Sequence, residues 1–75
     1  MYTPSERQLD QNSKAYKYHA PKDGQPERYT RIRDEFGKLA HLLITNCPES
    51  RELSVALTNL EQANMWANAA IARNE

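Results

Sequence analysis

The short connection "TNCP" at residues 45–48 joins two long amphipathic segments, and it constrains the fold more than any other feature. A connection this short forces the second helix to run antiparallel to the first. A Pro-Glu pair opens each segment, at 26–27 and 48–49. Proline suits the first turn of a helix, and glutamate favours the positive end of the helix dipole. The sequence therefore predicts an all-α fold, an antiparallel helical hairpin with helices at about 26–46 and 48–73.

Apolar residues in both segments recur every three or four positions, as they do along one face of an amphipathic helix. In the first segment they are Tyr29, Ile32, Phe36, Leu39 and Leu43. In the second segment they are Leu53, Ala56, Leu57, Leu60, Ala63, Ala67, Ala70 and Ile71. We expect the two stripes to face each other and to form the seam of the hairpin.

The residues before the hairpin show no apolar period, which predicts a short irregular N-terminal segment. Residues 1–15 are polar and contain Pro4, so we expect a flexible arm there and a hairpin domain at 16–75. The first residues contain no apolar run typical of a signal peptide, and the longest apolar run, 42–44, is too short to cross a membrane. We therefore expect a soluble, cytoplasmic protein without a membrane partner.

A chain of 75 residues buries too little surface to be stable without reinforcement. Cys47 is the only cysteine, so no intrachain disulfide can form, and the two histidines do not combine with it at a zinc-ligand spacing. We expect no metal and no cofactor. Self-association is the remaining way to stabilise the chain. It would also cover Met65 and Trp66, which lie outside the predicted seam. The alternative is that Trp66 packs against "YKYHAP" at 16–21 of its own chain.

Positive charge and tyrosines are concentrated between residues 14 and 33, although the net charge of the chain is zero. Lysine and arginine neutralise phosphates, and tyrosine rings stack on bases, so this window predicts a nucleotide site. A solvated basic face is an equally open interpretation. Asn64 and Asn68 are weak helix formers near the end of the second helix, and at a subunit interface their amides could bind a base edge or a ribose. No catalytic dyad, triad or glycine-rich phosphate loop is present, so we do not expect an enzyme.

The stretch "SRELSVALTNLEQANMWANAAIAR" at 50–73, with "YHAP" before the first helix, resembles the phage helical-hairpin proteins that sequester cyclic nucleotide signals. These are the anti-CBASS and Thoeris anti-defence sponges. The resemblance implies a symmetric oligomer, a hexamer of hairpins without catalytic activity. It also implies pockets between protomers that hold cyclic dinucleotides or related signals without cleaving them. Such a protein would act in the cytoplasm of an infected bacterium and block CBASS- or Thoeris-type signalling.

The resemblance further implies roles for individual residues. Tyr18 matches a tyrosine that stacks on the ligand, and Arg33 matches a basic residue of the first helix that contacts phosphate. Some relatives bind cyclic trinucleotides through an arginine where this chain has Ala69, so that second pocket is not implied here. The predicted ligand-binding residues are Tyr18, His19, Lys22, Arg31, Arg33, Trp66 and Asn68.

A function from a different class is a small helical interaction module that binds a host protein or a nucleic acid through the basic edge. Salt separates the two functions, because binding to a polyanion weakens steeply as salt rises. A pocket that holds two phosphates should lose much less affinity. We do not expect a nucleic-acid partner.

Overall fold

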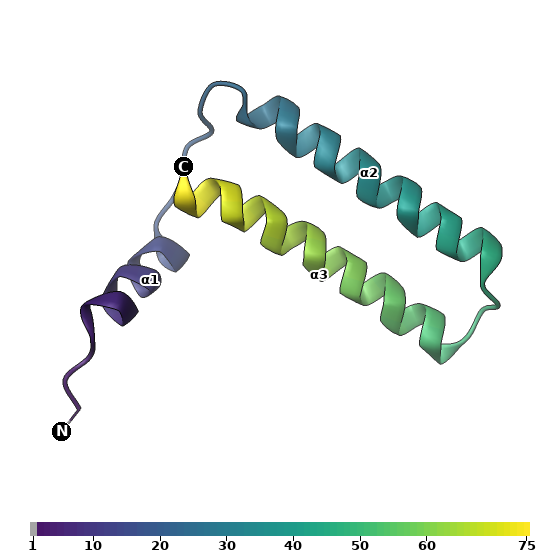
Figure 1. Cartoon of the computed structure of the whole chain (residues 1–75), viewed down its shortest axis with the longest axis horizontal. Helices are drawn as coiled ribbons and strands as arrows, with labels where there is room; N and C mark the ends of the chain where they lie inside the picture. Colours follow the sequence, from purple (N-terminus) through teal and green to yellow (C-terminus); the bar gives the residue numbers. More distant parts are fainter. Residues whose placement is uncertain (1) are drawn as a thin grey trace.

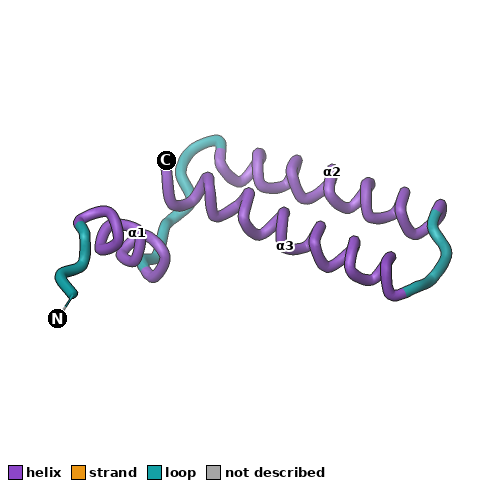
Figure 2. Tube along the Cα trace, turned by 60° about the horizontal axis from the view of Figure 1, so that its bottom comes forward, coloured by secondary structure: helices purple, strands orange, loops and turns teal. Residues whose placement is uncertain are grey.

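Three α-helices account for most of residues 2–75, the part of the chain that the computed structural model describes (Figure 1). They are α1 at Glu6–Tyr16, α2 at Gln25–Asn46 and α3 at Arg51–Asn74. α2 and α3 lie side by side and antiparallel, and α1 extends away from the open end of the pair (Figure 1 and Figure 2). The described residues contain no strand, so the predicted all-α hairpin is confirmed.

Residues 6–16 form a helix, so the prediction of an irregular segment is wrong there. The Ser5 hydroxyl accepts a hydrogen bond from the Gln8 N–H at 3.1 Å, and the Gln8 side chain accepts one from the Ser5 N–H at 3.2 Å. This capping box satisfies two N–H groups that a helix start otherwise leaves unpaired. Almost every residue of α1 is exposed, so no apolar period marks it in the sequence. The division into an arm at 1–15 and a domain at 16–75 stays a prediction.

Replacing Ser5 by alanine is expected to loosen α1 without disturbing the hairpin. An N-cap serine contributes about 1 kcal/mol, which is decisive for a short, exposed helix with marginal stability of its own. Cα chemical shifts of residues 6–16 should move toward coil values, while those of α2 and α3 stay in place. Ser13→Ala, inside the same helix, is the control and should leave the shifts helical. Unchanged shifts in Ser5→Ala would show that the cap does not hold α1.

The capping residues explain where the two hairpin helices begin. Gly24, with φ 82°, turns the chain ahead of α2, which starts one residue before the predicted position. α3 starts at Arg51, so the prediction of a start at Pro48 is wrong. Ser50 is the N-cap, and its hydroxyl accepts a hydrogen bond from the Leu53 N–H at 3.2 Å. Serine supplies a hydrogen bond there, whereas proline only avoids the loss of one, so Ser50 determines the boundary.

The seam between α2 and α3 is half-buried and differs in part from the predicted one. The half-buried residues that form it are Tyr29, Ile32, Phe36, Ala40 and Leu43 on α2, and Leu53, Ala56, Leu57, Leu60, Asn64, Ala67, Asn68 and Ile71 on α3. Leu39, Ala63 and Ala70 are exposed, so their predicted place in the seam is wrong. The other predicted seam residues are half-buried, so the apolar pattern identified the correct side of each helix. Asn64 and Asn68 take places in the α3 side of the seam that the pattern assigned to alanines.

The chain as a whole is a plate about one helix thick, because its extents are 50 × 38 × 13 Å and a helix with side chains is about 10–12 Å wide. Its radius of gyration is 16.7 Å, against about 11 Å for a compact domain of this length. No hydrophobic side chain among residues 2–75 is buried. The large apolar side chains exposed on the hairpin are Leu39, Leu42, Ile44, Val55, Met65 and Trp66. A single layer cannot enclose a core, so one chain leaves its apolar faces uncovered.

Candidate functional site

A hollow of about 570 Å³ lies where the segment between α1 and α2 passes the end of α3 (Figure 1). It brings together three of the predicted ligand-binding residues, Tyr18, His19 and Lys22. Across the hollow, Ala72, Arg73 and Glu75 come from the last turn of α3 and the residue after it. The site therefore combines residues that are neighbours in the sequence with residues some fifty positions later.

Tyr18 and His19 differ in how firmly they are held. The Nε2 of His19 donates a hydrogen bond to the main-chain oxygen of Lys14, and the two atoms are 2.9 Å apart. A carbonyl oxygen can only accept, so Nε2 carries the proton in this contact. Tyr18 next to it is 83% exposed, and its ring is open to a planar partner. An accessible tyrosine beside an anchored histidine and a lysine is suited to stack on a base and attract a phosphate.

Glu75 is held by three side chains from the start of α2 and the turn before it. Arg28 donates from Nη1 to Oε2 at 2.9 Å and from Nη2 to Oε1, and the Gln25 amide donates to Oε1 at 3.4 Å. Lys22 donates from Nζ to the main-chain oxygen of Glu75. These contacts close the open end of the hairpin.

Hydrogen bonding to Arg28 lowers the pKa of the Glu75 carboxyl below its ordinary value. A depressed pKa means that the contact contributes stability above the ordinary glutamate pKa of about 4.3. That contribution is lost as the pH falls through the lowered value. At neutral pH Glu75 is therefore an anion and remains paired with Arg28.

Arg33 lies apart from this hollow, in a groove of about 340 Å³ between α2 and α3. The groove is lined by Arg33, Phe36, Gly37, Ala40 and Ile44 from α2, and by Leu57, Leu60, Glu61 and Asn64 from α3. Arg33 makes no ion pair with any residue between 2 and 75. A guanidinium at the mouth of a largely apolar groove is available to an anionic ligand.

Asn64 and Asn68 stand in the seam, one turn apart on α3. The Oδ1 atom of each is buried and accepts no hydrogen bond within the described chain. A buried amide oxygen without a partner is costly, at roughly 1–3 kcal/mol. The two unpaired oxygens therefore lower the stability of the seam in a single chain.

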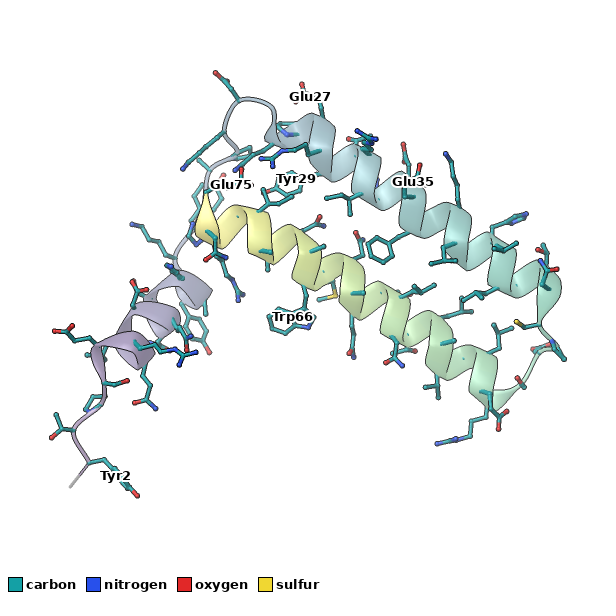
Figure 3. The ribbon with its side chains drawn as sticks, in the orientation of Figure 1. Tyr2, Glu27, Tyr29, Glu35, Trp66 and Glu75 are labelled. Atoms are coloured by element: carbon teal, nitrogen blue, oxygen red, sulfur yellow. The ribbon has the colours of Figure 1, made fainter. Side chains whose placement is uncertain are left out.

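Arg31 and Trp66 occupy two further places. Arg31 lies along α2 beside Glu35 and Leu39. Trp66 is 65% exposed and points away from α2 (Figure 3), and the guanidinium carbon of Arg73 is 5.7 Å from the centre of its ring. Trp66 is not among the residues that line the hollow around Tyr18. The alternative in which Trp66 packs against 16–21 of its own chain is therefore not what the structure shows.

A single chain thus brings Tyr18, His19 and Lys22 together and leaves the other four predicted residues at separate positions. Sequence reasoning missed Gln25 and Glu75, which line the hollow, and Arg28, which holds Glu75. Arg28 belongs to the basic window, which was the one local signal for it. Its partner, Glu75, lies 47 positions further along the chain, so no nearby residue indicates the pair.

Across residues 2–75, no three His, Cys, Asp or Glu side chains gather as a metal ion would need. None of the three helices described is both long and apolar enough to span a bilayer.

Comparison with known protein families gives one result. The family model described as "Acb2/Tad1, hairpin domain" matches residues 10–72. The match begins within α1 and ends in the last turns of α3, so all three helices contribute to it. No curated protein and no solved structure matches the chain.

Proposed function

The chain belongs to the Acb2/Tad1 hairpin-domain family of anti-CBASS and anti-Thoeris sponges, and on that premise we propose that it binds and sequesters cyclic nucleotide signals. Cyclic dinucleotides are the proposed ligands. The protein holds them intact, and it lowers the concentration of free signal that reaches the host's immune effectors. Sequestration needs affinity and many sites, and a small chain repeated by symmetry supplies both.

The observation that carries this proposal is the hollow beside α3 in a chain of this family. Tyr18 is exposed there beside His19 and Lys22, so an aromatic ring and a positive charge face the same space. A cyclic dinucleotide presents flat bases joined by phosphates, and it needs stacking and charge at close spacing. We assign base stacking to Tyr18 and the wall of the pocket to His19.

We further propose that copies of the chain complete the pocket, in a hexamer. The plate has two open faces, and neither can be covered by the chain itself. Arg33, supported by Lys22 and Arg31, would hold phosphate; Trp66 would line the wall, and Asn68 would bind a base edge or a ribose. Apart from Lys22, these residues lie away from the hollow in one chain, so the proposal requires a neighbouring subunit to bring them to it. The amide of Asn68 can both donate and accept hydrogen bonds, as a base edge requires.

Native mass spectrometry tests the proposed function most directly. The protein is measured alone and with a panel of cyclic di- and trinucleotides and cyclic ADP-ribose isomers. We expect a hexamer that takes up a whole-number set of intact cyclic dinucleotides. An oligomer that takes up nothing from the panel would contradict the proposal. Steep loss of binding to DNA between low and moderate salt would instead favour a polyanion-binding module.

A further inference from the structure

The most tightly built polar feature of the molecule is the turn that leads into α2. Gln25 is 3% exposed and is the one buried residue among residues 2–75. Its side-chain oxygen accepts a hydrogen bond from the Lys22 N–H at 3.0 Å, and its own N–H donates to the Lys22 carbonyl at 3.0 Å. Gly24 between them has φ 82°, a conformation that side chains disfavour. The turn fixes the Gln25 side chain and places Lys22, Gln25 and Arg28 at one end of the hairpin, and we call these three side chains the donor cradle.

An anion already occupies the donor cradle. Both carboxylate oxygens of Glu75 accept hydrogen bonds from Arg28, and one of them also accepts from the Gln25 amide (Figure 3 shows Glu75 at this end of the hairpin). A phosphate offers the same pair of oxygens to a guanidinium, and it binds in the same two-pronged geometry. Arg28 holds the side-chain carboxylate of Glu75 and Lys22 holds its main-chain oxygen, and the positive end of the α2 dipole lies at the same place.

The cradle also borders the hollow around Tyr18. Lys22, Gln25 and Glu75 line that hollow together with Tyr18 and His19. A nucleotide whose base stacks on Tyr18 therefore has its phosphate next to the donors that now hold Glu75. We propose that Lys22, Gln25 and Arg28 form a phosphate-binding subsite for which the Glu75 carboxylate is a built-in competitor.

This inference rests on the proposed function for the identity of the ligand. The competition between phosphate and Glu75 at the donor cradle can be tested separately. Glu75 must leave Arg28 before a phosphate can take its place, so the affinity for phosphate is set partly by the strength of that internal contact. The contact is exposed to solvent and therefore weak enough to be displaced. Glu75 would favour ligands with a well-placed phosphate over weakly bound anions.

Titration of inorganic pyrophosphate, followed by the NMR signal of the Gln25 side-chain amide, tests the cradle. We expect Glu75→Gln to bind pyrophosphate about threefold to fivefold more tightly than the unchanged protein, the effect expected from an exposed ion pair. Glutamine keeps the size of the side chain and removes the charge that competes. Equal affinity in the two proteins would overturn the inference.

Two further variants separate the cradle from a general change of charge. Glu27→Gln removes the same charge from a side chain that points away from Glu75 (Figure 3), so its gain should stay below about twofold. Arg28→Gln, added to Glu75→Gln, should abolish the gain, because the donor that the phosphate needs is then missing. A gain that survives the loss of Arg28 would overturn the assignment.

The same variants are then titrated with cyclic di-AMP and cyclic di-GMP. If Glu75→Gln binds pyrophosphate more tightly but no cyclic dinucleotide binds, the phosphate-binding subsite is supported and the proposed function is contradicted. If a cyclic dinucleotide binds but Glu75→Gln changes the affinity for neither probe, the proposed function is supported and the phosphate-binding subsite is overturned. We expect Glu75→Gln to bind both pyrophosphate and a cyclic dinucleotide more tightly than the unchanged protein does.

Discussion

Replacing Tyr18 by alanine is expected to weaken binding of a cyclic dinucleotide by about 5- to 150-fold and to leave the hairpin folded. Stacking of a base on an aromatic side chain contributes about 1–3 kcal/mol, and each 1.4 kcal/mol is a factor of ten in affinity. Tyr18 is 83% exposed, so its removal costs the folded chain little. Isothermal titration calorimetry measures the affinity, and circular dichroism checks the helix content.

Tyr16→Ala is the matched control for this prediction. Tyr16 is 86% exposed, lies two residues before Tyr18, and does not line the same hollow. Its removal should leave the affinity unchanged. Equal losses in the two variants would mean that neither ring has a specific role, and an unchanged affinity in Tyr18→Ala would place the stacking site elsewhere.

The phosphate side of the same site is tested by Arg33→Ala, with an expected loss of about 10- to 150-fold. Hydrogen bonds to charged groups contribute about 1.5–3 kcal/mol. Arg33 has no ion-pair partner among residues 2–75, so its removal leaves no carboxylate behind without a counter-charge. Arg51→Ala, at the far end of the hairpin, is the control. A loss in Tyr18→Ala with none in Arg33→Ala would assign the phosphates to another basic residue.

The second large effect is expected for Trp66→Ala, which should lower the melting temperature by more than about 12 °C. A tryptophan buried between subunits contributes about 3–5 kcal/mol, and each kcal/mol shifts the melting temperature of so small a chain by about 4–8 °C. If Trp66 stayed as exposed as it is in one chain, the change would be below about 0.5 kcal/mol. Thermal melts by circular dichroism, at two protein concentrations, distinguish the two cases.

Concentration dependence gives this prediction an independent check. An oligomer melts at a higher temperature when the protein is more concentrated, and a monomer does not. Light scattering after size exclusion should report smaller particles for Trp66→Ala than for the unchanged protein. Tyr2→Ala, at a position 98% exposed and outside every helix, should change neither the mass nor the melting temperature. A stable monomer in all three proteins would exclude the proposed assembly.

The hairpin itself was predictable because its determinants are local. Apolar residues at spacings of three and four mark each helix, and a connection of four residues forces the antiparallel arrangement. α1 was not predictable in the same way, because almost all of its residues are exposed and form no apolar stripe. Its signal was the pair Ser5 and Gln8 at cap spacing, which the sequence also contains.

The candidate site was predictable only where its residues are close in sequence. Tyr18, His19 and Lys22 lie within five positions, and a turn ahead of α2 keeps them together. Arg28 and Glu75 are 47 positions apart, and they meet because α2 and α3 have matching lengths and return the chain to its starting end. Helix lengths depend on the caps, and the cap at Ser50 was placed wrongly from the sequence.

Local patterns in the sequence specify two amphipathic helices, their antiparallel course and a basic, tyrosine-rich segment that leads into the first of them. Each follows from interactions within a few residues, which any fold of this chain must satisfy. The packing of α3 against α2 settled what the sequence left open, namely that Asn64 and Asn68 lie in the seam while Ala63 and Ala70 lie outside it. The final rotation of α3 depends on how the complete surfaces of the two helices fit together. Because alanines occur around much of α3, neighbouring rotations have similar apolar patterns, and the sequence does not distinguish between them.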